Sequence, residues 1–480
     1  MSQYLKQSKF IHVLRGKNFA CLYHSLTMDI VFVTTKYLNI FEKYQIAKRI
    51  ESNNTKPHFL KLLTRKNFLV NENKDKVSIR NLRTNLPKPN YTLLRVLMTN
   101  NCNLNCRYCK VKFNLKTKTV EIIKENDIRN ILKQFQELSP RFKKLVSITG
   151  GEPLLYFNEV KKIIELCKKE LKNYWIVLFT NATLLNKNIV EYLKKENILT
   201  VISVDGRKSH DRIRVFRNKQ GSYDLIKKNL NLLKRNGVKI GVSCVVGKHN
   251  IDNLFDDFKY IIDKFNPQSI GLNPLKYPSP KDFNFNLLIN PKRYVKEVYR
   301  LFKIARKRGI FIEQINRKLL PFTKQEFKFY ECGACGGKNI NIDANGNIGP
   351  CKSYLVMKKL YQKSSVAIRS SMVFKKLSER SPIFNNNCLS CPGIGICGGG
   401  CSYEAFVETG NILEFSERSC KVTKSFLELM FLDLFVLNRK IINKNLSKIG
   451  YYLIKRKERE KMYGKIKILP KTLKYSVGHK

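Results

Sequence analysis

The spacing of the cysteines constrains this chain more than any other feature of its sequence. Eleven of the 14 cysteines fall into two separated blocks. The first block has the spacing C-x3-C-x2-C and consists of Cys102, Cys106 and Cys109. The second block contains Cys332, Cys335, Cys351, Cys388, Cys391, Cys397, Cys401 and Cys420. Three thiolates can hold three irons of a 4Fe–4S cube and leave the fourth iron open, and eight more can close two further cubes. We therefore predict a redox enzyme with several iron–sulfur clusters.

Disulfides and zinc are the alternative uses of clustered cysteines. No charged n-region followed by an apolar h-region opens the chain, so we expect a cytoplasmic protein whose thiols stay reduced. The C-x2-C pair of Cys388 and Cys391 could by itself belong to a zinc ribbon. The C-x3-C-x2-C block has no nearby fourth ligand, which suits an open iron–sulfur cube better. Cys21, Cys167 and Cys244 lie in apolar surroundings, where we assign them to packing.

The charge balance is strongly basic, with a formal net charge of +54 from 91 Lys and Arg against 37 Asp and Glu. Lysine occurs in every segment, which is typical of a solvated surface and makes nucleic acid an improbable partner. An acidic peptide is the better prediction. The longest apolar stretch, 426–437, is too short and too charged to cross a bilayer, which needs about 20 residues. It is predicted to be a docked helix, and no membrane is expected as a partner.

The pattern of apolar residues divides the chain into four regions. Residues 1–90 form a small α/β unit, which ends at the turn-forming segment 87–90. In residues 91–318, strand-like and helix-like segments alternate, which predicts a parallel sheet with right-handed crossovers and most simply a full or partial β/α barrel. The predicted strands are 93–98, 145–148, 176–179, 200–204, 240–246, 269–273 and 310–315. Residues at the C-terminal ends of these strands should face the reaction.

Residues 319–445 lose this alternation and contain short loops rich in Cys and Gly, as in the segment 395–401. Such loops fold around metal, because glycine lets the backbone approach the ligand atoms. A helical pattern returns over 421–443. The basic C-terminal tail, 446–480, is predicted to be solvated or mobile beyond residue 456.

Two motifs resemble the radical S-adenosylmethionine superfamily. The loop from Cys102 to Cys109, with the aromatic Tyr108 before the third cysteine, resembles its signature loop. The segment 149–154, which contains Gly150, Gly151 and Glu152, resembles the strand end that binds the amino group of the cofactor's methionine part. The resemblance implies an α/β fold with a partial (β/α)6 TIM-like barrel, in which the three cysteines hold a cluster that binds S-adenosylmethionine. Glu152 would accept from a cationic group or fix the loop.

Further strand ends supply polar residues for the cofactor. Asn181 follows one predicted strand, where a turn role is as good an interpretation as a ligand role. By resemblance, Ser203 and Asp205 occupy positions of ribose contacts. Arg214 matches a position that often meets the cofactor carboxylate.

The second cysteine block resembles the SPASM extension of this superfamily. The resemblance implies a first auxiliary 4Fe–4S cluster on Cys332, Cys335, Cys351 and Cys401. It implies a second on Cys388, Cys391, Cys397 and Cys420, so that the chain would hold three clusters in all. If either Cys332 or Cys335 is not a ligand, the first auxiliary cluster has an open iron that could bind substrate.

Family members cleave S-adenosylmethionine reductively, and the resulting 5′-deoxyadenosyl radical abstracts hydrogen from a substrate. Members with this extension mostly modify peptides or proteins. The region 1–90 is similar to the winged-helix-like modules that bind leader segments in maturases of ribosomally made peptides (RiPPs). The resemblance thus implies a peptide maturase that forms a thioether or carbon–carbon crosslink. Its substrate is expected to be acidic, and its electron donor a flavodoxin or ferredoxin.

Two alternatives remain open at this point. A sulfatase-maturating enzyme, which oxidises Cys or Ser to formylglycine, shares every cluster motif. Such enzymes resemble each other in placing Asp after the cysteine that matches Cys351, whereas this chain has Lys352. A non-catalytic electron relay would also hold clusters, but it needs neither an open cube nor the motif around Glu152.

Overall fold

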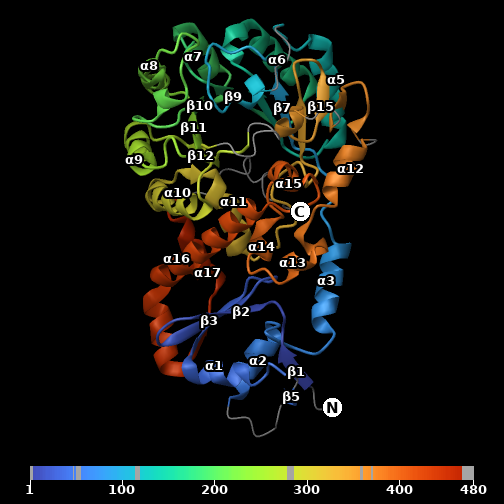
Figure 1. The fold of residues 1–480 in the computed structure, drawn as a ribbon, viewed down its shortest axis with the longest axis vertical. Coiled ribbons are helices and arrows are strands. Elements are labelled where there is room, and N and C mark those ends of the chain that lie inside the picture. The colour runs from blue at the N-terminus through green and yellow to red at the C-terminus, as the bar shows by residue number, and fades with distance from the viewer. Residues whose placement is uncertain are drawn as a thin grey trace.

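The structure is a computed structural model that describes residues 4–46, 48–49, 56–113, 119–277, 286–356, 360–368 and 371–466. Three parts follow one another along the long axis of the molecule: an α/β barrel, the cysteine-rich region, and the N-terminal module (Figure 1). No helix in the described ranges has the length and apolar character needed to cross a membrane.

The largest element is a ten-stranded sheet with the order β13-β12-β11-β10-β9-β8-β7-β14-β15-β16. Its parallel neighbours run from β7 to β13 and confirm the predicted partial barrel. These strands are β7 (Leu93–Leu97), β8 (Lys144–Thr149), β9 (Tyr174–Thr180), β10 (Leu199–Ser203), β11 (Ile240–Val246), β12 (Ser269–Pro274) and β13 (Phe311–Ile312). The helices between and after them are α5 (Glu125–Leu138), α6 (Phe157–Glu170), α7 (Lys187–Lys195), α8 (Tyr223–Arg235), α9 (Leu254–Phe265), α10 (Pro291–Ala305) and α11 (Glu313–Lys324).

The barrel forms because its strands are apolar on the side that the helices cover. Val146, Ile148 and Leu178 are fully buried and share one apolar core with the inner faces of the helices. Each helix places its apolar residues on one face, as in Ile128, Ile131 and Leu132 of α5. Burial of these faces fixes the sheet, and the polar residues at its strand ends remain available for a site.

One prediction at the end of the barrel is wrong. The predicted strand 310–315 has only the two residues of β13, because Glu313 already begins α11. Residue 318, the expected end of the barrel domain, lies within α11. The cysteine-rich region also continues the barrel sheet. Its strand β14 (Asn339–Ile342) pairs in parallel with β7, and β15 (Asn347–Gly349) and β16 (Gln362–Lys363) follow it in antiparallel order.

The described part of the N-terminal module contains two small sheets and three helices. One sheet has the order β5-β1-β6, and the other has the order β17-β4-β3-β2. The strands are β1 (Tyr4–Gln7), β2 (Ile11–Arg15), β3 (Phe19–His24), β4 (Ile30–Thr34), β5 (Lys48–Arg49), β6 (Leu69–Val70) and β17 (Tyr451–Leu453). The helices are α1 (Thr35–Glu42), α2 (Pro57–Arg65) and α3 (Lys74–Thr84). Strand β17, from the C-terminal part of the chain, thus completes a sheet of the N-terminal module by pairing with β4.

The prediction of a solvated or mobile tail is wrong for the described part of the C-terminus. Helix α16 (Glu417–Ile449) leads into β17, and α17 (Arg456–Glu460) packs against the protein. Arg459 is completely buried, and its guanidinium donates to the carbonyl oxygen of Phe322 over 3.0 Å and to that of Met28. The basic composition of this segment therefore did not indicate that α17 is packed and that its Arg459 is buried. Residues 467–480 of the predicted tail lie outside the described residues.

Candidate functional site

The first three cysteines lie together on the loop that follows β7. Cys102, Cys106 and Cys109 share one apolar cluster with Leu104 and Tyr108. All 14 cysteines are free thiols. Burial raises the pKa of Cys102 to about 12 and that of Cys106 to about 11. Gathered, buried thiols of this kind become thiolates when a cation binds them, so the donor set fits an iron cluster.

Two glycines at the end of β8 bring this strand against the entrance of the cysteine loop. A Cβ atom on Gly150, whose φ is +147°, would lie 2.6 Å from the oxygen of Thr99. A Cβ atom on Gly151 would lie 1.8 Å from the oxygen of Asn101. The backbone N–H of Gly151 donates to Thr99 over 2.7 Å. Only glycine permits this approach, so the motif has a structural reason beside its predicted cofactor role.

Glu152 fixes the ends of two barrel strands and is only 1% exposed. Its Oε1 accepts from the N–H of Leu154 (3.1 Å) and the hydroxyl of Thr180 (2.6 Å), and its Oε2 accepts from the N–H of Asn181 (2.7 Å). Burial raises its pKa to about 7, against the effect of these donors. Of the two predicted roles for Glu152, the structure displays the one in which it fixes the loop.

Asn181 connects the end of β9 to the cysteine loop. Its Nδ2 donates to Oδ1 of Asn103 over 2.9 Å and lies 3.9 Å from the sulfur of Cys102. Asn103 in turn donates to the hydroxyl of Thr183 over 2.8 Å. The strand end and the loop are therefore one hydrogen-bonded unit beside the first cysteine.

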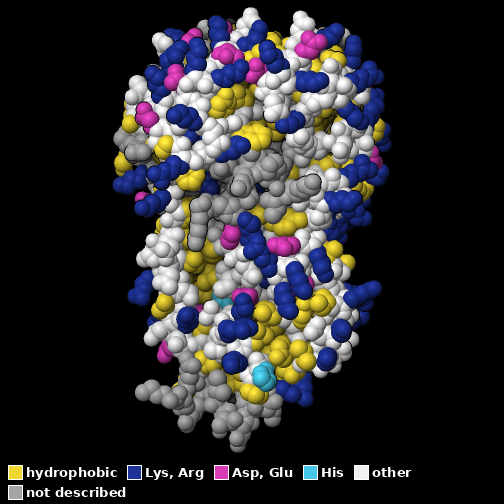
Figure 2. All heavy atoms as spheres, turned by 180° about the vertical axis from the view of Figure 1, so that it is seen from behind, with side chains coloured by type: hydrophobic (Ala, Val, Ile, Leu, Met, Phe, Trp, Pro, Cys, Tyr) yellow, Lys and Arg dark blue, Asp and Glu magenta, His cyan; other side chains and the backbone are white. Residues whose placement is uncertain are grey.

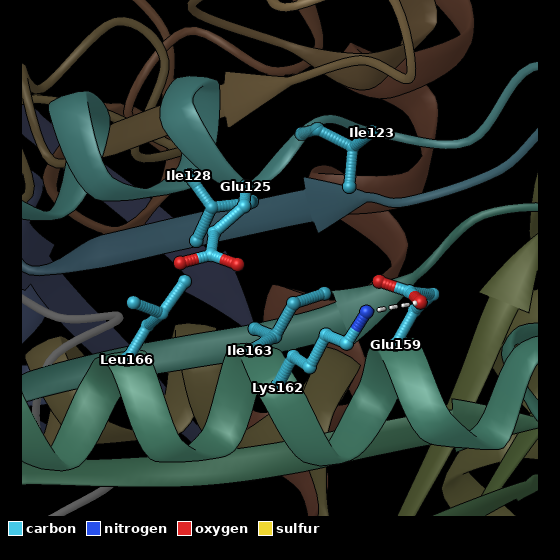
Figure 3. Close-up of a pocket in the computed structure, with 7 residues that line it drawn as sticks. All are labelled: Ile123, Glu125, Ile128, Glu159, Lys162, Ile163 and Leu166. Atoms are coloured by element: carbon cyan, nitrogen blue, oxygen red, sulfur yellow. Dashed lines mark hydrogen bonds and ion pairs between the residues drawn. The ribbon is translucent and has the colours of Figure 1, made fainter.

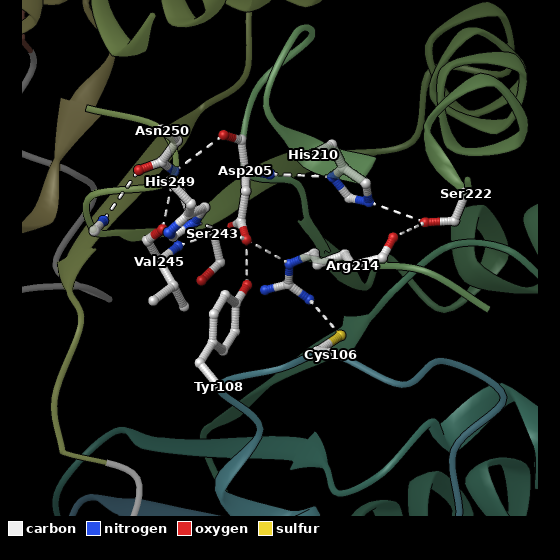
Figure 4. A network of polar contacts seen from close by, with 12 residues as sticks. Cys106, Tyr108, Asp205, His210, Arg214, Ser222, Ser243, Val245, His249 and Asn250 are labelled. Carbon is white, nitrogen blue, oxygen red and sulfur yellow. Dashed lines mark hydrogen bonds and ion pairs between the residues drawn. The ribbon is translucent and has the colours of Figure 1, made fainter. Parts of the chain in front are cut away.

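Asp205 and Arg214 form a buried ion pair next to Cys106 (Figure 4). Oδ2 of Asp205 accepts from Nε of Arg214 (2.9 Å) and from the hydroxyl of Tyr108, and Oδ1 accepts from the N–H of Val245 (2.9 Å). Burial alone would raise the pKa of Asp205, but the Arg214 charge and further donors hold it well below its usual range. The Nη1 of Arg214 lies 4.0 Å from the sulfur of Cys106.

The predicted ribose contact of Asp205 differs from this arrangement. Its side chain has no exposed surface, and both oxygens accept hydrogen bonds within the protein. It therefore positions the guanidinium of Arg214 beside Cys106. Ser203 is half-buried at the end of β10, in register with Ser243 of β11.

His249 belongs to the same network and was not predicted from the sequence. It is 7% exposed, its Nε2 lies 3.7 Å from Oδ2 of Asp205, and its ring centroid lies 5.7 Å from that of Tyr108 (Figure 4). The only sequence feature that could have indicated a site role for His249 is its position in the loop after β11. A single histidine in a loop is too weak a pattern to indicate a site.

Four of the later cysteines gather beside the barrel mouth. Cys332, Cys335, Cys351 and Cys401 lie in one apolar cluster with Tyr354. The sulfurs of Cys332 and Cys335 are 3.9 Å apart, and Nζ of Lys276 lies 2.9 Å from the sulfur of Cys401. This is the set that the resemblance implied for the first auxiliary cluster, and a cation beside a thiol suits an anionic cluster.

The remaining four cysteines gather on short helices farther toward the N-terminal module. Cys388 is on α13 (Asn386–Leu389), Cys397 ends α14 (Ile394–Cys397), and Cys420 is in the first turn of α16. Burial raises the pKa of Cys388 to about 12, and the neighbouring thiolates of Cys397, Cys420 and Cys391 add to this rise. These four therefore lie close to one another, as the second implied set requires.

Lys110 connects the two cysteine regions. It directly follows Cys109, and its Nζ donates to the hydroxyl of Ser353 over 3.2 Å and lies 3.7 Å from the ring centroid of Tyr403. Ser353 is two residues after Cys351, and Tyr403 is two residues after Cys401. One lysine side chain therefore reaches from the first cysteine loop to the first auxiliary set.

A separate shallow pocket lies between α5 and α6 on the outside of the barrel (Figure 3). It is lined by Ile123, Glu125, Ile128, Glu159, Lys162, Ile163 and Leu166. Lys162 pairs with Glu159 across 2.9 Å. None of the predicted site residues lines it, so it takes no part in the site at the strand ends.

An open iron–sulfur site at the mouth of a partial β/α barrel defines a class of redox enzymes that bind S-adenosylmethionine. Residues 96–261 match the family model of the Radical SAM superfamily. The chain is 30% identical over 361 residues to the radical SAM cyclopropyl synthase TigE of Paramaledivibacter caminithermalis, which covers 69% of this chain and 72% of that protein. The chain therefore belongs to the radical SAM superfamily, whose members are enzymes with a 4Fe–4S cluster and S-adenosylmethionine.

Two further proteins are similar over most of their length. A cysteine-type anaerobic sulfatase-maturating enzyme of Clostridium novyi is 26% identical over 327 residues, which cover 63% of this chain and 85% of that protein. The crystal structure of Streptococcus suis SuiB bound to its precursor peptide SuiA matches with a TM-score of 0.55 and 16% identity. This match covers 87% of this chain and 99% of SuiB, and it confirms the fold.

Proposed function

We propose that this chain is a peptide maturase that oxidises a side chain of its substrate by radical chemistry. The observation that carries the proposal is the reach of Lys110 from the first cysteine loop to residues beside Cys351 and Cys401. A substrate between these regions would meet the radical on one side and an electron acceptor on the other. SuiB, which binds the precursor peptide SuiA, and the sulfatase-maturating relative, which acts on a protein, support a peptide or protein as substrate.

The chain's own residues have distinct tasks in this chemistry. When bound on Cys102, Cys106 and Cys109, a 4Fe–4S cluster supplies an electron for reductive cleavage of S-adenosylmethionine. Gly150 and Gly151 leave room for the cofactor's methionine part, and Glu152 and Asn181 hold the strand ends around it. Arg214, fixed by Asp205, offers its guanidinium to the cofactor carboxylate, and Ser203 lies at the ribose position.

We assign the eight later cysteines to two auxiliary 4Fe–4S clusters, one on each gathered set. Iron content tests this assignment directly. The wild type should bind about 12 irons per chain, and Ala variants of the three residues Cys102, Cys106 and Cys109 should bind about 8. Ala variants of Cys388, Cys391, Cys397 and Cys420 should also retain about 8. Full iron content in either variant would refute the corresponding assignment.

The substrate is proposed to be an acidic peptide. Lys110, Lys276 and Lys352 gather near the first auxiliary set, and within the described part of the chain none of the three has an ion pair with a carboxylate. Lys and Arg side chains also cover the face seen in Figure 2, with few Asp and Glu among them. Such a surface attracts acidic partners, including a flavodoxin or ferredoxin as electron donor.

The N-terminal module is proposed to hold the leader segment of this peptide. Its strand β2 forms the edge of its sheet, since β2 pairs only with β3 in the order β17-β4-β3-β2. A leader that adds a strand would keep the core peptide at a high effective concentration near the barrel. The domains proposed are 1–90 for this module, 91–318 for the barrel and 319–445 for the auxiliary clusters, in a reducing cytoplasmic compartment.

Formation of formylglycine is the second candidate, because the Clostridium novyi relative is a sulfatase-maturating enzyme. Lys352 stands where a carboxylate base would be expected, and an ammonium group cannot accept the proton from a substrate thiol. We therefore rank this function second. Aldehyde formation on a cysteine-containing sulfatase peptide would reverse the ranking.

The leading proposal is tested with the small peptides encoded beside this gene. The reconstituted enzyme, reductant and S-adenosylmethionine are incubated with each peptide, and products are analysed by mass spectrometry. We expect 5′-deoxyadenosine together with a peptide that has lost two hydrogens. Unchanged peptides despite 5′-deoxyadenosine formation would contradict the maturase proposal.

A further inference from the structure

Arg380 is an unusually buried cation in the cysteine-rich region. It lies just after α12 (Met372–Ser378) and is 1% exposed. Its Nε and Nη2 donate to the carbonyl oxygen of Glu414 over 2.9 and 2.6 Å, and its Nη1 donates to that of Gly400 over 3.1 Å. Its guanidinium also lies 4.8 Å from the ring centroid of Phe415. The groups that accept these three hydrogen bonds are neutral carbonyl oxygens.

The charge of Arg380 has no carboxylate partner among the described side chains, as is also true of Arg459. Arg306, the comparable buried guanidinium on the barrel side, forms an ion pair with Asp433. Burial of an unpaired charge is costly, because hydrogen bonds to carbonyls do not neutralise it. A negatively charged group near Arg380 would remove this cost.

The position of Arg380 indicates which negatively charged groups would neutralise its charge. Gly400, which accepts from Nη1, directly precedes Cys401 of the first auxiliary set. Gly399 lies two residues after Cys397 of the second set, and a Cβ atom placed on it would be 3.4 Å from Nη1 of Arg380. The guanidinium therefore lies beside the short turn that connects the two sets.

The guanidinium of Arg380 lies within electrostatic reach of cysteines in both sets. Its charge acts on Cys332 and Cys335 of the first set and on Cys388 and Cys420 of the second.

We propose that Arg380 is the shared counter-ion of the two auxiliary clusters and favours the reduced form of each. This inference rests on the proposed ligand sets. One-electron reduction adds one negative charge to a cluster without breaking a bond, and the electron comes from the substrate radical or from the reductant. A fixed cation in a buried site stabilises the added charge, which makes each cluster a better electron acceptor. Arg380 is a positioning residue, since it contacts neither substrate nor S-adenosylmethionine.

The test compares Arg380→Gln with Arg380→Lys in the full chain that carries Ala at Cys102, Cys106 and Cys109. Gln keeps a donor for the carbonyls but loses the charge, whereas Lys keeps the charge. Reduction of the auxiliary clusters is followed by electron paramagnetic resonance during potentiometric titration. Arg459→Gln is the matched control, because Arg459 is equally buried and also donates to carbonyl groups.

We expect Arg380→Gln to lower the equilibrium constant for reduction of both clusters at least tenfold, which is about 59 mV for one electron. Arg380→Lys should retain most of the wild-type value, and Arg459→Gln all of it. Unchanged potentials in a fully loaded Arg380→Gln protein would overturn the proposal. If Arg380→Gln prevents cluster loading while Arg380→Lys permits loading, the positive charge is required. If both variants prevent loading equally, the shape of the side chain rather than its charge explains the role of Arg380, and the proposal fails. Fewer than about 8 irons in the parent protein would refute the ligand sets instead.

Discussion

Glu152 accepts from donors at the ends of both β8 and β9, where we propose that S-adenosylmethionine binds. Gln at this position would direct an amide group against N–H and O–H donors. We expect Glu152→Gln to lower the affinity for S-adenosylmethionine about 5- to 150-fold, since a buried donor left unpaired costs about 1–3 kcal/mol.

Anaerobic calorimetric titration measures this affinity. The control is Glu159→Gln on α6, whose carboxylate forms a surface pair with Lys162 and should be dispensable. Equal affinities of the two variants would show that Glu152 does not organise the site.

Asp205 illustrates how a buried charge positions a second one. Asp205→Asn removes the counter-ion of Arg214 and leaves the guanidinium charged and buried. The expected loss of stability is about 3–5 kcal/mol, measured by chemical denaturation of the reconstituted protein. Asp263→Asn removes an exposed partner of Lys259 and should cost about 0.5 kcal/mol. A similar small loss in both variants would contradict this account of Asp205.

At the scale of secondary-structure elements, the C-terminal end of the chain stabilises the N-terminal module. Strand β17 pairs with β4, and Arg459 of α17 donates to Met28, which follows β3. Truncation after residue 450 removes both contacts and exposes the edge of β4. We expect faster proteolysis of the module and a lower Tm.

Truncation after residue 466 keeps β17 and α17 and is the control for this experiment. Limited proteolysis with identification of the cut sites distinguishes the two proteins. If both are cut in the module at the same rate, the C-terminal strand does not stabilise it.

His24 makes the same module sensitive to acid. Burial lowers the pKa of His24 to about 4, and its Nδ1 faces the backbone N–H groups of Leu26 and Thr27. Because the unfolded chain binds this proton near pH 6.5, stability falls as the pH drops below 6.5 toward 4. Between pH 7.5 and 5 the loss should be on the order of 2 kcal/mol.

Thermal unfolding of the wild type and of His24→Gln across this range tests the prediction. The wild type should lose stability more steeply than the variant. Parallel pH profiles would show that His24 does not titrate with folding.

The elements also show what sequence patterns can and cannot predict. Apolar runs separated by amphipathic helices identified the barrel strands, because burial on both faces leaves a strong local signal. The pairing of β14 with β7 and of β17 with β4 has no local sequence signal, because pairing between strands hundreds of residues apart depends on tertiary packing. Likewise, the resemblance of the cysteine motifs to a known family implied the ligand sets, whereas the contacts of Asp205 and His249 depend on which strand ends become neighbours.

At the scale of the whole molecule, the barrel, the cysteine-rich region and the N-terminal module follow one another along the long axis (Figure 1). Helix α16 begins beside Cys420 and ends at Gly450, next to the strand that joins the module's sheet. At 1.5 Å per residue, its 33 residues span about 50 Å. The proposed leader site, auxiliary clusters and cofactor site are thus connected by packed structure, which would hold a bound peptide in a fixed relation to the barrel mouth.

We expect this molecule to cleave S-adenosylmethionine at the cluster on its first cysteine loop. The measurement is 5′-deoxyadenosine released without oxygen, with dithionite as reductant, by the reconstituted wild type and by Cys106→Ala. Product should come from the wild type alone. Absence of product from an iron-loaded wild type, or equal amounts from both proteins, would show that the first cysteine loop does not carry this reaction.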